Sequence, residues 1–197
     1  MANILRETVH GIGRVCIDDE MMKHRKLFFR GKVNGKSANE LIKQLMHLEQ
    51  EGCGEEITLY INSLGGEVTS GLAVYDVIRL MESPVNTVCI GMAASMGAIL
   101  FLAGRHRSML PHTRLMIHDP FYESGNIGGK KSCEIQRELD KLNETREALA
   151  EIIAEKTGKS VDEVYKVTAE DTYYSAKEAL EFGLATEIIT DAGGLKT

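Results

Sequence analysis

The chain has 197 residues, of which 43% are hydrophobic and 26% charged, enough for one domain with a substantial core. The formal net charge of −6 argues against a surface that binds nucleic acid or an anionic membrane. No segment reaches the roughly 18 apolar residues of a membrane span, and the N-terminus lacks the apolar core of a signal peptide. We therefore expect a cytoplasmic protein.

The four cysteines are scattered, with no CxxC pair and no histidine partner at the spacing of a zinc site. The sequence therefore indicates four reduced thiols and offers no zinc site.

Residues 1–25 are polar and weakly patterned, and we expect them to form an N-terminal arm before a domain at 26–197. In the domain, β-rich runs predict strands at 27–31, 57–62, 85–90, 114–118 and 184–189. Helical patterns predict helices at about 37–51, 69–81, 95–104 and 131–157. Capping boxes, a Ser followed three residues later by a Glu, predict that helices begin at Ser37, Ser160 and Ser175.

Strand, tight turn and helix follow one another twice between residues 57 and 104, with the first turn at 63–66. This order is typical of parallel strands joined by crossover helices, so the fold class is α/β. The helix expected at 131–157 has a narrow apolar stripe on a charged background, which suits either a lever packed on the domain or a contact between subunits.

Ser95 is the one hydroxyl in a run of small and apolar residues at 89–104. A serine at the start of a helix lies near unpaired N–H groups, which is how a nucleophile is placed beside an oxyanion site. The simpler interpretation is a serine that caps the helix in a seam of small residues, since serine is a common N-cap.

Two further residues supply the chemistry that Ser95 would need. His118 ends an apolar strand and Asp171 lies between two predicted helices, so the set fits a nucleophile, a base and an orienting carboxylate. Taken singly, each residue is a weak signal, because a lone histidine at the end of an apolar strand is more often structural and an aspartate between helices is more often a loop or capping residue. Backbone N–H groups at Gly66, within the Gly65-Gly66 pair, and at Met96 are candidates for the oxyanion site.

The chain resembles the Clp protease proteolytic subunit (ClpP) family over about residues 21–189. The resemblance rests on Tyr-Ile-Asn-Ser-Leu-Gly-Gly at 60–66, Gly-Met-Ala-Ala-Ser-Met-Gly-Ala at 91–98 and Met-Ile-His-Asp-Pro at 116–120, followed by Asp171 with Tyr-Tyr-Ser-Ala-Lys-Glu-Ala. The motifs occur in order and at family-like spacing.

This resemblance implies the ClpP/crotonase-like fold of repeated β-β-α units with a long protruding handle helix. It implies Ser95 as nucleophile, His118 as general base, Asp171 as orienting carboxylate, and the N–H groups of Gly66 and Met96 as oxyanion donors. A strand that pairs with substrate backbone would comprise Ser124, Gly125, Asn126, Ile127 and Gly128.

The resemblance also implies partners. They are further copies of the chain, in heptameric rings that stack in pairs as a tetradecamer, and an AAA+ unfoldase that uses ATP and delivers unfolded polypeptide. No metal or cofactor is implied, and neither is nucleic acid or a membrane.

The chain departs from the family pattern at several positions. Leu64 stands where proline is usual, and Asp119 follows the histidine where glutamine is usual, so that it could compete with Asp171 for His118. Thr58 and Ser108 replace aromatic residues of the pocket where unfoldase loops dock, and residues 6–20 of the arm, which gates the axial pore in the family, lack the usual sequence.

These departures keep two other functions open. One is a non-catalytic or weakly active barrel subunit that assembles with an active paralogue. The other is a crotonase-type acyl-CoA enzyme, which shares the fold and the paired N–H donors but does not require the Ser-His-Asp set.

Overall fold

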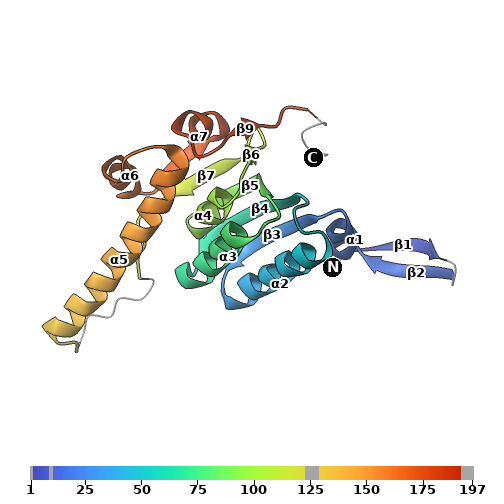
Figure 1. Cartoon of the computed structure of the whole chain (residues 1–197). Helices are drawn as coiled ribbons and strands as arrows, with labels where there is room; N and C mark the ends of the chain where they lie inside the picture. The colour runs from blue at the N-terminus through green and yellow to red at the C-terminus, as the bar shows by residue number, and fades with distance from the viewer. Residues whose placement is uncertain (1, 9–10, 123–128, 192–197) are drawn as a thin grey trace.

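A mostly parallel β-sheet forms the centre of the computed structural model, which describes residues 2–8, 11–122 and 129–191 (Figure 1). The strands in this part of the chain are β1 (Asn3–Thr8), β2 (Gly11–Cys16), β3 (Lys26–Val33), β4 (Ile57–Gly66), β5 (Val85–Ala94), β6 (Arg107–Met109), β7 (Arg114–Ile117), β8 (Thr172–Ser175) and β9 (Glu187–Ile188). The helices are α1 (Ile17–Lys23), α2 (Gly35–Glu51), α3 (Val68–Leu80), α4 (Met96–Leu102), α5 (Ser132–Thr157), α6 (Val161–Thr168) and α7 (Ala176–Phe182). The predicted α/β class with parallel strands and crossover helices is confirmed.

Strand β5 is the branch point of the sheet. Its first part pairs in parallel with β6, through Thr87 opposite Arg107, while its end pairs in parallel with β7, through Ala94 opposite Met116. Strand β8 then adds to β7 in the antiparallel direction. The sheet therefore divides at β5, and one of its two branches begins beside the end of the strand that leads into Ser95.

The apolar core lies between the sheet and helices α2, α3 and α4, which run along one face of it (Figure 1). Leu59 and Ile61 of β4 and Leu45 of α2 are fully buried there. Because successive side chains of a strand point to opposite faces, Tyr60 belongs to a second, smaller cluster with Val88 and Ile189.

Several predicted boundaries were wrong, for local reasons. Helix α2 is capped by Asn34, whose side chain accepts hydrogen bonds from the N–H groups of Lys36 and Ser37, so Ser37 is the third helical residue and not the cap. The segment 63–66, predicted as a turn, continues β4, with Gly65 and Gly66 at φ values of +93° and +149°.

Two short strands, β6 and β8, were not predicted, and the last strand is confined to Glu187–Ile188. The capping boxes at Ser160 and Ser175 are confirmed as the starts of α6 and α7.

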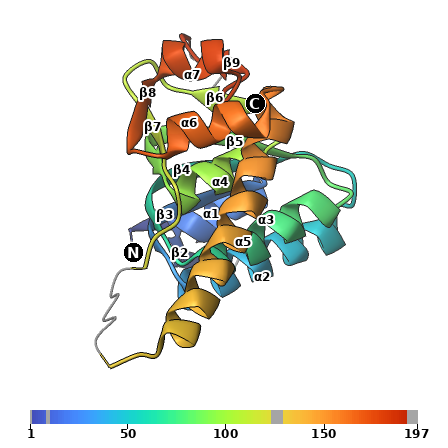
Figure 2. The same cartoon turned by 90° about the vertical axis from the view of Figure 1, so that its left-hand side faces the viewer.

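Helix α5 is present where a helix was expected at 131–157, and Gly158 ends it in the left-handed conformation. Its buried residues, Leu149, Ala150 and Ile153, all lie in its second half. The first half extends away from α6 and from the sheet, as Figures 1 and 2 show.

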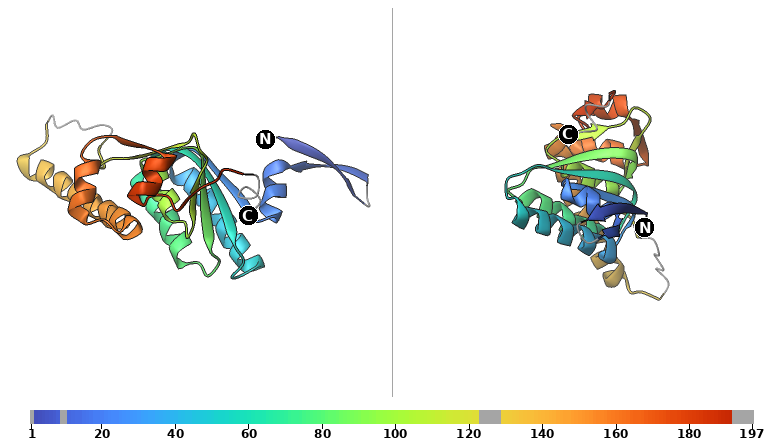
Figure 3. Two further views of the ribbon diagram at one scale, coloured as in Figure 1. Left: turned by 90° about the horizontal axis from the view of Figure 1, so that it is seen from above. Right: turned by 90° about the vertical axis from the view of Figure 1, so that its right-hand side faces the viewer.

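The described part of the N-terminal region contains secondary structure that its weak pattern did not predict. Strands β1 and β2 form an antiparallel hairpin, and α1 follows it. Figure 3 shows that the hairpin projects from the end of the molecule opposite to α5. No helix of the described residues is both long and apolar enough to cross a membrane.

Candidate active site

Ser95 occupies a sharp turn between β5 and α4. Its backbone has φ +53° and ψ −125°, a region that residues other than glycine rarely adopt and that costs of order 1–3 kcal/mol. Ser95 stands at the N-cap position of α4, yet its side chain makes no capping hydrogen bond. The interpretation of Ser95 as a helix cap is therefore wrong, and the hydroxyl is available for other contacts.

Backbone contacts hold this turn in place. The Ser95 N–H donates to the carbonyl of Met116 on β7 at 2.9 Å, and the Ser95 carbonyl accepts from the N–H of Ala98 at 2.9 Å. Close packing adds to these bonds, because a Cβ at Gly65 would lie 2.7 Å from the Ser95 Cβ. A Cβ at Gly97 would lie 2.8 Å from the Ser63 carbonyl oxygen. The predicted seam of small residues is present, and it fixes the direction of Ser95.

The branch of the sheet brings His118 to this turn. Since Ala94 is opposite Met116 in the β5–β7 pair, the residue that follows β7 comes next to the residue that follows β5. The His118 side chain is 12% exposed.

The antiparallel β7–β8 pair brings Asp171 to the same place, because Ile117 is opposite Thr172. The His118 Nδ1 lies 3.4 Å from the Asp171 Oδ1, and the Asp171 side chain is 61% exposed. Ser95, His118 and Asp171, which are far apart in the sequence, thus line one cleft of about 660 Å³.

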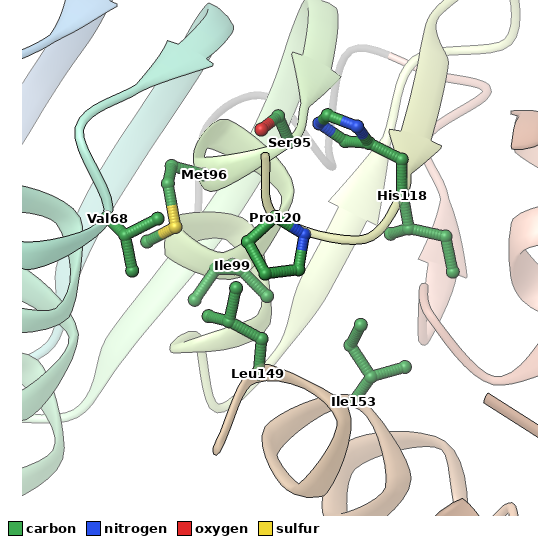
Figure 4. Close-up of a pocket in the computed structure, with 9 residues that line it drawn as sticks. Val68, Ser95, Met96, Ile99, His118, Pro120, Leu149 and Ile153 are labelled. Carbon is green, nitrogen blue, oxygen red and sulfur yellow. The ribbon is translucent and has the colours of Figure 1, made fainter. Parts of the chain in front are cut away.

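A small apolar pocket of about 30 Å³ lies beside this cleft, and Ser95 and His118 both line it (Figure 4). The rest of its lining is apolar and includes Pro120, with Leu149 and Ile153 contributed by α5. Within the described residues the Ser95 hydroxyl makes no hydrogen bond to the His118 ring, so the His118–Asp171 contact is present without the Ser95–His118 bond.

Gly66 and Met96, the two predicted oxyanion donors, each line a pocket that Ser95 also lines. Gly66 lines the cleft, and a Cβ there would be 2.1 Å from the Val33 carbonyl oxygen, so only glycine fits. Met96 is the first residue of α4, where the N–H group has no acceptor within its own helix. The five residues 124–128, predicted to bind substrate, lie outside the described residues.

Asp119 does not compete for His118, contrary to the hypothesis from the sequence. Its carboxylate contacts Arg146 at 2.6 Å and accepts a hydrogen bond from the Thr168 hydroxyl at 2.6 Å. The carboxylate beside the His118 Nδ1 is that of Asp171.

The sequence did not indicate Phe121, two residues after Asp119, as a residue of the site. Phe121, whose side chain is 64% exposed, lines the cleft, and its ring centroid lies 5.4 Å from that of His118. Its position directly after the histidine motif was the available signal. Among the described residues, no group of three or more His, Cys, Asp or Glu side chains is placed to hold a metal ion.

The family model for Clp protease matches residues 13–192. The chain belongs to the Clp protease family. This is a family of serine peptidases, and the α/β fold with its parallel sheet agrees with the ClpP-type fold. The match begins inside residues 1–25, so it includes the end of β2 and all of α1 in the region assigned to the arm.

The residues that the sequence suggested as departures from the family pattern have distinct environments. Leu64 is 74% exposed and lines the cleft. Thr58 and Ser108 are only 7% and 8% exposed, and the Ser108 hydroxyl donates to the Glu187 carboxylate at 3.2 Å.

Proposed function

We propose that this member of the Clp protease family is a serine endopeptidase that hydrolyses peptide bonds of unfolded polypeptides. Ser95 is the nucleophile, His118 the general base and Asp171 the carboxylate that orients the base. The observation that carries the proposal is the strand register: β5 and β7 end at one cleft just before Ser95 and His118, and β8 begins there just after Asp171. The strained Ser95 turn, with a hydroxyl not used as a cap, supports the role of nucleophile.

In the proposed reaction, the Ser95 Oγ attacks the carbonyl carbon of the peptide bond while the His118 Nε2 accepts its proton. His118 then gives this proton to the leaving amine, and an acyl-enzyme remains on Ser95. Water attacks the ester with His118 again as base, which releases the acid and restores the serine. Asp171, beside the Nδ1, holds the imidazole in the tautomer that leaves the Nε2 free to accept the proton.

The N–H groups of Gly66 and Met96 are the proposed donors to the oxyanion. Support comes from the pockets that each of them lines together with Ser95 and from the free N–H expected at the first residue of a helix. Donors of this kind, fixed before the reaction, stabilise the developing charge by about 2.7–4 kcal/mol each.

Substrate backbone would pair with the segment 124–128, as the resemblance implies. Such pairing reads little sequence, because main-chain hydrogen bonds supply the affinity. The cleft residues Leu64 and Phe121 would contact substrate side chains, since both are exposed and apolar at this opening.

The proposed assembly is a barrel of two stacked heptameric rings, with α5 as the handle between them. The unburied first half of α5 supports this role, because it carries residues such as Leu139, 47% exposed, that a contact with a second copy would cover.

The proposed partner is an AAA+ unfoldase that docks at the exposed Phe28 ring, which lies over the buried cluster of Tyr60, Val88 and Ile189. The Phe28 ring stacks on Tyr60 at 4.7 Å and is 39% exposed, so an aromatic surface persists although Thr58 and Ser108 are not aromatic.

The test is labelling of the assembled protein with a fluorophosphonate probe, together with hydrolysis of a fluorogenic peptide. Wild type is expected to be labelled at Ser95 and to cleave the peptide, and Ser95→Ala is expected to lose both, with kcat lower by about 10⁶-fold. Ser132→Ala, at an exposed serine that begins α5, is the matched control and should behave as wild type.

A wild-type chain that is neither labelled nor active would sink the proposal. Because the Ser95–His118 hydrogen bond is missing, the chain should also be assayed in a mixture with a paralogue. Activity that appears only in the mixture would identify a subunit that depends on its partner. Binding of acyl-CoA without labelling would indicate the crotonase-type reaction.

A further inference from the structure

Asp119, the residue after His118, is bound to two helices at once. Its Oδ2 lies 2.6 Å from the Arg146 Nε on α5, and its Oδ1 accepts a hydrogen bond from the Thr168 hydroxyl on α6. The Asp119 N–H also donates to the Thr168 carbonyl at 2.7 Å. The Oδ1 and the backbone N–H of Asp119 are therefore hydrogen-bonded, whereas the Oδ2 is held by charge alone, because the Arg146 Nε makes no hydrogen bond. None of these contacts involves the His118 ring.

The partners of Asp119 are themselves well held. Thr168 is only 4% exposed. The Arg146 guanidinium lies 4.0 Å from the centre of the Tyr165 ring, so a cation–π contact with α6 supports it while it pairs with Asp119. Arg146 and Asp119 are about one-third exposed, at 34% and 29%, so the pair is partly shielded from solvent.

Asp119 and Thr168 are close in the chain to His118 and Asp171, the candidate base and its orienting carboxylate. Asp119 directly follows His118, and Thr168 closely precedes Asp171 along the chain. The two Asp119–Thr168 hydrogen bonds therefore join the segment after β7 to the end of α6, just before the β7–β8 pairing of Ile117 with Thr172 begins. They fix the distance between the segment that carries His118 and the segment that carries Asp171.

The charges add a second effect. Asp119 follows His118 in the chain, and Asp171 faces the His118 Nδ1. Only one of these two carboxylates can orient the imidazole through its Nδ1. Arg146 and Thr168 occupy the oxygens of Asp119, which leaves Asp171 as the carboxylate 3.4 Å from the Nδ1. Removal of Arg146 would leave the Asp119 carboxylate without its cation next to the imidazole.

We propose that Asp119 and Arg146 are positioning residues that hold His118 against Asp171 and keep a second carboxylate away from the imidazole. This inference rests on the proposed peptidase function for its catalytic consequence, whereas the geometric part does not depend on it. Because Arg146 belongs to α5, the same contact ties the long helix to the base.

The first test measures phosphonylation of Ser95 by a fluorophosphonate, in which the serine oxygen displaces fluoride from phosphorus, corrected for the folded fraction of each variant. Asp119→Asn and Arg146→Gln are each expected to slow this labelling by about 10- to 100-fold, the effect of a small misplacement of reacting groups. In peptide hydrolysis kcat should fall and KM should stay the same. Arg146→Gln should be the more severe change, because it leaves a lone carboxylate, and the double variant should recover to the level of Asp119→Asn.

Conservative and distant substitutions separate positioning from general stability. Arg146→Lys keeps the charge and should restore part of the rate. Arg79→Gln breaks another exposed ion pair to α5, with Glu155 at 3.1 Å, and should change the rate by less than about two-fold. If Asp119→Asn and Arg146→Gln are labelled by the fluorophosphonate at the wild-type rate, or if Arg79→Gln is labelled equally slowly, the proposal is wrong.

A crystal structure of Arg146→Gln gives a readout that needs no activity. We expect the His118–Asp171 contact to be lost in this variant and kept in Arg79→Gln. Wild type that is not labelled would overturn the peptidase function alone, whereas an unchanged His118–Asp171 contact in Arg146→Gln would overturn the positioning role alone.

Discussion

The two sides of the cleft are built by different forces. On the nucleophile side, the Ser95 turn is fixed by backbone hydrogen bonds and by contacts so close that Gly65, Gly66 and Gly97 accept no Cβ. On the base side, His118 and Asp171 are held by polar side-chain contacts between β7, α5, α6 and β8.

This difference sets how each side responds to change. Steric exclusion in a close-packed seam has no intermediate state, so the nucleophile side is either formed or lost. Ion pairs and hydrogen bonds at partly exposed groups weaken by degrees, with substitution, salt or pH. We therefore expect the base side to be the adjustable half of the site.

The largest effect is expected for Gly66→Ala, on the nucleophile side. The new Cβ would lie 2.1 Å from the Val33 carbonyl oxygen, at a φ of +149°, so β3 and β4 must separate. We expect a loss of more than about 3 kcal/mol in the free energy of unfolding, and no peptidase activity. Urea unfolding followed by circular dichroism measures this loss.

Gly158→Ala is the matched control, because Gly158 also has a positive φ, +70°, but nothing lies within 4 Å of its Cβ position. It should lose only about 1–2 kcal/mol, the cost of the left-handed conformation. If the two variants are equally stable, excluded volume is not what holds the nucleophile side.

The same contrast explains which parts of the fold the sequence could predict. Helix starts at Ser160 and Ser175 and the helix end at Gly158 follow from local chemistry within a few residues, and all three were predicted correctly. The segment 63–66 was misassigned because glycines with positive φ usually mark turns, whereas here they let β4 pass close to Ser95.

Features that depend on long-range pairing could not be predicted. Strands β6 and β8 are three and four residues long, too short for a periodic pattern, and they exist because β5 and β7 offer them edges. The family resemblance indicated Ser95, His118 and Asp171 as site residues, and the strand register shows that they line one cleft. The resemblance indicated no partner for Asp119, because its contacts with Arg146 and Thr168 join segments far apart in the chain.

An intermediate effect is expected for Asp171→Asn, on the base side. The Asp171 side chain is 61% exposed and its one carboxylate contact with His118 is 3.4 Å long, so the fold should barely depend on it. We expect the free energy of unfolding to change by less than about 0.5 kcal/mol and kcat for a peptide substrate to fall by about 10²- to 10⁴-fold. Asp140→Asn, an exposed aspartate of α5, should leave both unchanged. An unaltered kcat in Asp171→Asn would remove this residue from the proposed mechanism.

The smallest effect concerns acid, which should loosen the base side before the nucleophile side. Hydrogen bonds from the Ser175 hydroxyl and N–H lower the pKa of the Glu178 carboxyl below its ordinary value of 4.5. Since the folded-state pKa is the lower one, the stabilisation is present above about pH 4.5 and is lost as the pH falls through the folded-state value. Ser175 ends β8 and pairs with Arg114 of β7, so this loss acts on the strands that carry His118 and Asp171.

Hydrogen exchange read by mass spectrometry between pH 6 and pH 3.5 tests this order. Amides of β8 and α7 should lose protection at a higher pH than amides of β4 and β5, and Glu178→Gln should remove that early step. In Glu178→Gln the protection of β8 should already be lower at pH 6, because the amide forms weaker hydrogen bonds with Ser175 than the carboxylate does. If both sides of the cleft lose protection together, and Glu178→Gln matches wild type, then the base side is not the adjustable half.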